Sequence, residues 1–293
     1  MVLQGCYAAI VTPFADNGAI DEDGLRSNIE FLIENGVTGI VPCGTTGESA
    51  TLSWEEHLRV VDIALEQAAS RVQIIAGAGS NNTAESIRAA VHAQEKGADA
   101  ILCITPYYNK PTQEGLYQHY KAISNAVDVS IVMYNVPGRT GVNCAPATVE
   151  RLCECDNIIG IKEASGNLLQ VSEIRRRCGD RMTVLSGDDA LTLPILACGG
   201  RGGISVVANI LPHKMSTMVN ACLTGDFVKA RALHEELLPV SNALFIETNP
   251  IPVKTAMNAL GLHAGSLRLP LVAMGDENKR SLLDVLRESG LLS

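Results

Sequence analysis

A lysine at the end of an apolar segment is the most reactive candidate in the sequence. Residues 158–162 read Ile-Ile-Gly-Ile-Lys, so Lys162 follows bulky aliphatic side chains and a glycine, a setting that it shares with none of the other lysines. Burial disfavours an ammonium ion and favours the neutral amine, which attacks carbonyl carbon atoms and forms a Schiff base. The alternative is an ion pair with neighbouring Glu163. Because side chains alternate along a strand, the two groups should point in opposite directions, which argues against that pairing.

Further polar groups follow other apolar segments. Tyr134 ends the segment before the lysine, where its phenol could move protons at a carbonyl compound, and a tyrosine that only packs is the alternative. Thr45 and Thr46 lie between two glycines, and this loop can bring backbone N–H groups close to a carboxylate. It lacks the ending of a phosphate-binding loop, so nucleotide binding is disfavoured. Arg139 lies in a later loop and suits bidentate binding of a carboxylate, although a solvated surface arginine explains it equally well.

The elements that must position these groups are short apolar segments separated by helical patterns. Such uninterrupted apolar segments are typical of parallel strands covered on both faces, and their alternation with helices predicts a (β/α)8 TIM barrel. A doubly wound open sheet is the alternative, but the glycine-rich turn that marks it does not follow the first segment. In the barrel the active site lies at the carboxyl ends of the strands. The predicted strands are residues 8–12, 39–43, 73–77, 100–105, 130–135, 158–163, 183–187 and 203–208.

After the last predicted strand the chain is wholly helical. Helices are predicted at 226–242, 252–260 and 278–289, which is more than barrel closure requires. We therefore expect a barrel with the active site at 1–224 and a C-terminal helical extension at 225–293 that packs against it.

Composition restricts the class of protein. Of 293 residues, 46% are hydrophobic and 19% are charged, which excludes a disordered chain, and no apolar run approaches membrane-spanning length. The 23 basic and 32 acidic residues give a net charge of -9, which disfavours nucleic acid and membranes as partners. The nine cysteines predict free thiols, and without a signal-peptide pattern we expect a cytoplasmic protein. No residues have metal-ligand spacing, so neither a metal nor an organic cofactor is predicted.

Six longer motifs, taken together, are specific to one enzyme family. They are 44–48 (GTTGE), 105–109 (TPYYN), 134–140 (YNVPGRT), 159–164 (IGIKEA), 185–189 (LSGDD) and 249–254 (NPIPVK). On these motifs the chain resembles, essentially from end to end, the 4-hydroxy-tetrahydrodipicolinate (dihydrodipicolinate) synthase family of pyruvate-dependent class I aldolases, which are related to N-acetylneuraminate lyase. The resemblance implies that Lys162 forms an imine with pyruvate and that the enamine attacks L-aspartate 4-semialdehyde, in lysine and diaminopimelate biosynthesis.

The resemblance also implies a proton relay and an assembly. By position, Thr45, Tyr134 and Tyr108 would form the relay. In this family the tyrosine that matches Tyr108 comes from the neighbouring subunit, which implies at least a dimer and usually a homotetramer, a dimer of dimers.

Substrate-binding residues follow from the same comparison of positions. Thr46 would hold the pyruvate carboxylate and Arg139 the semialdehyde carboxylate, while Gly187 and Ile204 would line the pocket through backbone groups. The sugar-acid lyases typically lack an arginine that matches Arg139, which favours the synthase. Two alternatives stay open, namely another pyruvate-dependent class I aldolase such as a sugar-acid lyase, and a catalytically silent relative that binds a small acid.

A regulatory site is the last implication of the resemblance. Many bacterial and plant synthases are inhibited by L-lysine, and Glu85 would supply a carboxylate for its ammonium group. Trp54 stands where bacterial relatives often have a smaller polar residue. The alternative is a helix surface on which Trp54 and His57, one turn apart, pack against a partner. The positions that match the lysine site are Ser49, Ala50, Trp54, His57, Asn81, Glu85 and Tyr107.

Overall fold

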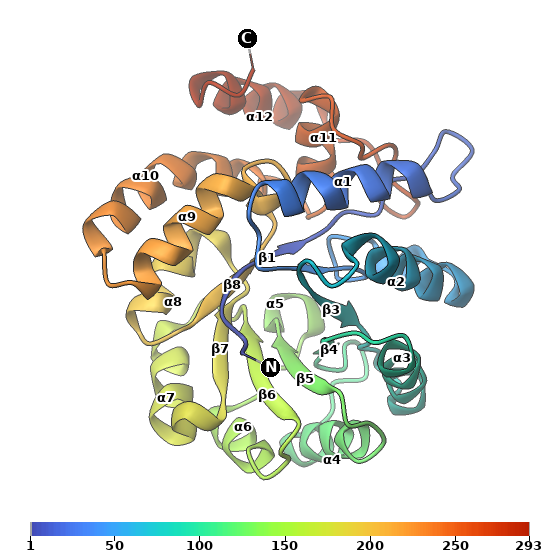
Figure 1. The fold of residues 1–293 in the computed structure, drawn as a ribbon, viewed down its shortest axis with the longest axis vertical. Helices are drawn as coiled ribbons and strands as arrows, with labels where there is room; N and C mark the ends of the chain where they lie inside the picture. The colour runs from blue at the N-terminus through green and yellow to red at the C-terminus, as the bar shows by residue number, and fades with distance from the viewer. Residues whose placement is uncertain (1, 293) are drawn as a thin grey trace.

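Eight parallel strands close into a barrel. The computed structural model describes residues 2–292, and its strands pair in chain order until β8 returns to β1 (Figure 1). This architecture confirms the predicted (β/α)8 TIM barrel. The strands are β1 Gly5–Ala9, β2 Gly39–Val41, β3 Gln73–Gly77, β4 Ala100–Ile104, β5 Ser130–Asn135, β6 Ile158–Glu163, β7 Thr183–Ser186 and β8 Gly202–Ser205.

The first and last strands end earlier than the sequence predicts. The predicted strands run to residues 12 and 208, whereas β1 ends at Ala9 and β8 at Ser205. Beyond these ends the Asn209 side chain accepts a hydrogen bond from the backbone N–H of Val11 and donates one to the carbonyl of Ala9. The apolar residues that follow both strands are buried between barrel and helices. Hydrophobicity therefore continues past the point where strand pairing stops.

Helices surround the barrel, as Figure 1 shows. A capping box begins α2, where the Ser53 hydroxyl accepts from the backbone N–H of Glu56 and the Glu56 carboxylate accepts from that of Ser53. The helices are α1 Glu22–Glu34, α2 Trp54–Ala68, α3 Thr83–Glu95, α4 Gln113–Ser124, α5 Pro137–Thr140, α6 Pro146–Leu152, α7 Leu168–Cys178, α8 Thr192–Ala197, α9 Pro212–Leu223, α10 Phe227–Ala243, α11 Ile251–Ala259 and α12 Asp276–Glu288. Within residues 2–292 no helix has the length and apolar character needed to cross a membrane.

The alternation of side chains along the strands divides the core into two layers. One layer fills the barrel interior and includes Tyr7, Val41, Val132 and Leu185. The larger layer lies between the strands and the helices. Because alternate residues of one strand enter different layers, the position of a residue in its strand decides whether its side chain faces the barrel interior.

The last three helices lie outside the ring of strands. In Figure 1, α10 lies beside α9, whereas α11 and α12 lie at the edge of the molecule near α1. The chain that flanks α11 returns to the loop after β2, since Asn249 donates to Thr46 and the backbone N–H of Arg268 donates to Glu48. The C-terminal part of the chain therefore contacts the carboxyl end of the barrel directly.

Candidate active site

Lys162 and Tyr134 face each other across two neighbouring strands. The register of β5 and β6 pairs Tyr134 with Lys162, and the ammonium nitrogen of Lys162 lies 4.3 Å from the centroid of the phenol ring. Both side chains are 6% exposed. Parallel strand pairing thus brings a buried amine and a phenol together at the carboxyl end of the barrel.

Glu163 points away from Lys162, as alternation along a strand requires. Its carboxylate accepts hydrogen bonds from the Asn135 and Gln170 side-chain amides and from the backbone N–H of Ser165. Lys162 is therefore not paired with its neighbouring carboxylate.

Gly187 leaves the space that the lysine side chain occupies. A Cβ atom at this position would lie 3.0 Å from Cγ and Cε of Lys162 and 2.7 Å from Cβ of Ala164. The end of β7 can approach Lys162 this closely only with a glycine. Ile204, on β8, is buried inside the barrel.

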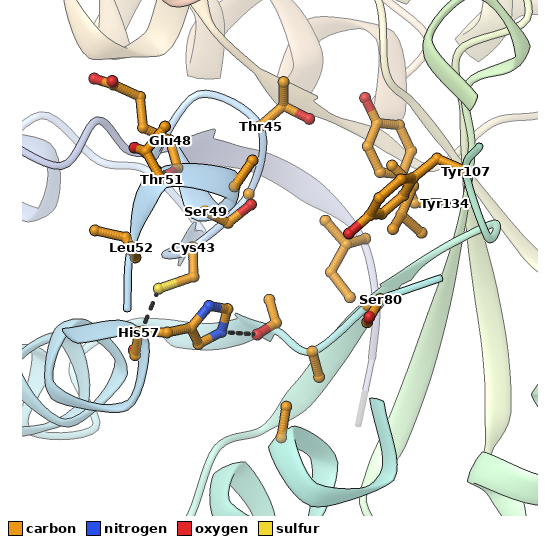
Figure 2. Close-up of a pocket in the computed structure, with 18 of the residues that line it drawn as sticks. Cys43, Thr45, Glu48, Ser49, Thr51, Leu52, His57, Ser80, Tyr107 and Tyr134 are labelled. Carbon is orange, nitrogen blue, oxygen red and sulfur yellow. Dashed lines mark hydrogen bonds between the residues drawn. The ribbon is translucent and has the colours of Figure 1, made fainter. Parts of the chain in front are cut away.

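A cavity of about 780 Å³ opens beside this pair, at the carboxyl ends of the first strands (Figure 2). Thr45, Tyr134 and Arg139 line it, and Figure 2 shows Thr45 on the loop after β2 and Tyr134 on the other side of the opening. The structure thus brings these three predicted site residues to one cavity. Other predicted residues do not lie on its wall, namely Lys162, Thr46, Tyr108, Gly187, Ile204 and Asn81.

The two threonines lie in a sharply turned loop. Cys43 and Glu48, on either side of them, have φ values of 55° and 53°, in the left-handed region that side chains rarely adopt. Thr46 is buried, and its hydroxyl oxygen accepts a hydrogen bond of 3.0 Å from the Asn249 side-chain amide. Arg139, on α5, is exposed and donates from Nη2 to the backbone carbonyl of Asn249 at 3.1 Å.

A buried ion pair fixes the end of this loop. Lys254 is 1% exposed, and its ammonium group donates to Glu48 at 2.6 Å and to the backbone carbonyls of Thr12 and Ser266. Burial lowers the pKa of Lys254, and the neighbouring Glu48 carboxylate acts in the opposite direction. Asn249 and Lys254 lie in one motif of the sequence, whose spacing alone indicates no role for either residue. The contacts of this buried amide and this buried lysine become visible only in the folded chain.

Tyr107 and Tyr108 lie in the loop after β4. Tyr107 lines the cavity, whereas the side chain of Tyr108 is 89% exposed and its backbone has a φ of 70°. A single chain therefore does not bring Tyr108 to Lys162 or Tyr134.

Most residues of the predicted lysine site line the same cavity. They are Ser49, Ala50, Trp54, His57, Glu85 and Tyr107. The Trp54 and His57 rings stack with centroids 6.4 Å apart, and His57 Nε2 lies 2.7 Å from the carbonyl of Gly77. Burial lowers the pKa of His57. Glu85 accepts from Ser80 Oγ at 2.7 Å. Asn81 lies in the loop after β3, where its backbone carbonyl accepts a hydrogen bond from the Asn109 side-chain amide.

Comparison with known proteins identifies the family. The model of the dihydrodipicolinate synthetase family matches residues 2–289. The chain belongs to this family. A 4-hydroxy-tetrahydrodipicolinate synthase from Pelobacter propionicus is 53% identical over 291 residues, which cover 99% of this chain and all of that protein.

Solved structures of dihydrodipicolinate synthases share the fold over almost the whole chain. The chloride-inhibited enzyme from Acinetobacter baumannii, complexed with pyruvate, has a TM-score of 0.97 at 43% identity and covers 99% of this chain and 100% of its own. The enzyme from Cyanidioschyzon merolae with lysine bound has a TM-score of 0.96 at 40% identity, with 99% of both chains covered. In the part of this chain that the structure describes, no cluster of three or more His, Cys, Asp or Glu residues could hold a metal.

Proposed function

We propose that this chain condenses pyruvate with L-aspartate 4-semialdehyde to give 4-hydroxy-tetrahydrodipicolinate, through a Schiff base on Lys162. The observation that carries the proposal is the buried amine of Lys162 in register with Tyr134, beside a cavity that Thr45 and Arg139 also line. Relatives that are named for this synthesis support the choice of substrates. The reaction serves lysine and diaminopimelate biosynthesis.

The chemistry begins at the Lys162 amine. Its nitrogen attacks the keto carbon of pyruvate, water leaves, and a protonated imine forms. Loss of a proton from the methyl carbon gives the enamine, whose carbon attacks the aldehyde of the semialdehyde. The amino group of the product chain then attacks the imine carbon, closes the ring and releases Lys162. Because the protonated imine accepts the electron pair, no organic cofactor or metal is needed in this scheme.

Proton transfers need groups next to the imine. The contact of the Tyr134 ring with Lys162 supports this role for Tyr134, and Thr45 lines the same cavity. Tyr108 of the partner subunit would complete the relay, because the Tyr108 of a single chain is directed to solvent. A homotetramer built as a dimer of dimers in the cytoplasm is the assembly that we propose.

Two carboxylates must be held in the complex. Thr46 would bind the pyruvate carboxylate, and Arg139, at the mouth of the cavity, would bind that of the semialdehyde with its planar guanidinium group. Gly187 and Ile204 would line the pocket through backbone groups.

The decisive experiment is borohydride reduction with and without pyruvate, followed by peptide mapping by mass spectrometry. A pyruvate-dependent adduct on Lys162 is expected, and the Lys162→Arg protein should show none. An adduct on another residue, or no adduct, would overturn the imine mechanism. Condensation assays with the semialdehyde, and cleavage assays with sugar acids, then test the acceptor. Cleavage of a sugar acid without condensation would replace the synthase by a lyase.

We also propose that L-lysine binds in the same cavity, at the predicted lysine site, and inhibits the enzyme. The Glu85 carboxylate suits an ammonium group there, and a lysine-bound relative supports the choice of ligand. Inhibition by L-lysine that weakens about tenfold or more in Glu85→Gln is the expected result. Equal inhibition of both proteins would remove Glu85 from the site.

A further inference from the structure

Asn249 contacts two groups that the proposed function assigns to different substrates. Its side-chain amide donates to the hydroxyl oxygen of Thr46 at 3.0 Å, and its backbone carbonyl accepts from Arg139 at 3.1 Å. The residue is buried, and it reaches Thr46 from 203 positions further along the chain. One residue of the C-terminal part thus connects the pyruvate side of the site with the semialdehyde side.

The direction of the first hydrogen bond determines what the hydroxyl of Thr46 can do. A hydroxyl has one hydrogen and two lone pairs. Since the amide of Asn249 occupies a lone pair, the hydrogen of Thr46 stays available for a further acceptor. A carboxylate is such an acceptor, because an ionised carboxylate cannot donate. Asn249 therefore orients Thr46 as a donor toward an anion.

The segment that carries Asn249 is anchored by a second contact on its C-terminal side. Lys254, in the first turns of α11, forms the buried ion pair with Glu48, which follows the threonines in the loop after β2. The Asn249 side chain also has an oxygen, Oδ1, that is buried without a hydrogen-bond partner among the described residues. A buried polar atom without a hydrogen-bond partner lowers the stability of the fold. The presence of such an atom at Asn249 therefore favours a role in binding.

We infer that Asn249 is a positioning residue for recognition of the pyruvate carboxylate, and that it acts by holding the hydroxyl of Thr46 as a hydrogen-bond donor. Its backbone carbonyl separately steadies Arg139. The inference rests on the proposed function and adds a residue to it. A substitution of the Asn249 side chain should therefore change the contact with Thr46 alone. The contact of Arg139 is made to the backbone carbonyl and should stay in place.

Asn249→Asp tests this separation with a side chain of the same shape. Aspartate cannot donate to Thr46, whose hydroxyl then donates to the new carboxylate, and its negative charge repels the carboxylate of pyruvate. The KM for pyruvate should rise about 10-fold to 100-fold, whereas kcat and the KM for the semialdehyde should stay within about threefold. Asn242→Asp, which adds the same charge at an exposed position on α10, is the matched control and should change neither KM.

A second variant covers the case in which the new charge prevents folding. Asn249→Ala adds no charge and should raise the KM for pyruvate about 5-fold to 10-fold. In a double-mutant cycle with Thr46→Val, it should have little further effect, because the hydroxyl on which Asn249 acts has been removed.

The outcomes separate the inference from the proposed function. An unchanged KM for pyruvate in Asn249→Asp would mean that Thr46 donates to Asn249, and would overturn the inference while pyruvate still labels Lys162. An equal rise in both KM values would also overturn it, since general distortion explains that result. Failure of wild-type protein to form the pyruvate adduct would remove the proposed function and the inference with it.

Discussion

Lys162 and Tyr134 are held in place differently from the loop that carries Thr45 and Thr46. Lys162 and Tyr134 lie on adjacent strands, where regular pairing sets their separation. Thr46 is held from 203 positions away by Asn249, and the loop end at Glu48 from 206 positions away by Lys254. Strand pairing is repeated around the barrel and tolerates the loss of one contact. The loop depends on a few buried polar contacts, so single substitutions should affect it more.

The largest effect is expected where the loop is tethered. Lys254→Met leaves the Glu48 carboxylate buried without its partner, which should lower the free energy of unfolding by about 4 kcal/mol. The double variant Glu48→Leu/Lys254→Met removes both charges and should recover most of the loss. Urea unfolding of the three proteins measures this. Equal losses in the single and double variants would show that the ion pair itself contributes the stability.

The next effect concerns Lys162 and Tyr134. Tyr134→Phe keeps the ring beside Lys162 and removes the hydroxyl, so kcat should fall about 10²-fold to 10³-fold because proton transfer is slowed. The free energy of unfolding should not change, and borohydride should still trap the adduct with pyruvate. A variant that kept its kcat would leave Tyr134 with a packing role only.

A smaller effect is expected from crowding the lysine. Gly187→Ala places a methyl group 3.0 Å from two carbon atoms of Lys162 and should displace its amine. Misplacement of a reacting group is costly, so kcat/KM should fall about 10-fold to 10²-fold. The rate of pyruvate-dependent reduction by borohydride reports directly on the imine. If Gly203→Ala, whose methyl group would meet its nearest neighbours at 3.4 Å, caused an equal loss, displacement of Lys162 would not be the cause.

The smallest effect is expected at the start of α2, just beyond the loop that carries Thr45 and Thr46. Ser53→Ala removes the side-chain half of the capping box and should cost about 1 kcal/mol of stability. The KM for pyruvate should not change. A changed KM would connect this helix to the loop that precedes it and would weaken the contrast between the two regions.

The same contrast explains what the sequence could predict. Apolar segments with polar ends located the strands, and Lys162 and Tyr134 with them, because side-chain alternation and parallel pairing are local rules. The ends of β1 and β8 were wrong, because apolar residues continue into the layer between barrel and helices. Contacts of Asn249 and Lys254 could not be derived, since they depend on how a distant segment returns to the barrel. The same local rules do not bring Tyr108 to Lys162 and Tyr134, because its side chain is exposed in the single chain.

The ion pair between Glu48 and Lys254 also has a consequence for the timing of synthesis. The ribosome completes the eight strands, and with them Lys162 and Tyr134, before it adds the residues that hold Thr46 and Glu48. Until Lys254 has been synthesised, the Glu48 carboxylate has no cation to pair with. Burial of an unpaired carboxylate is costly, so the loop that carries Glu48 stays exposed to water. The eight strands, with Lys162 and Tyr134 on them, are therefore synthesised before α11 supplies the lysine that holds the end of the loop after β2.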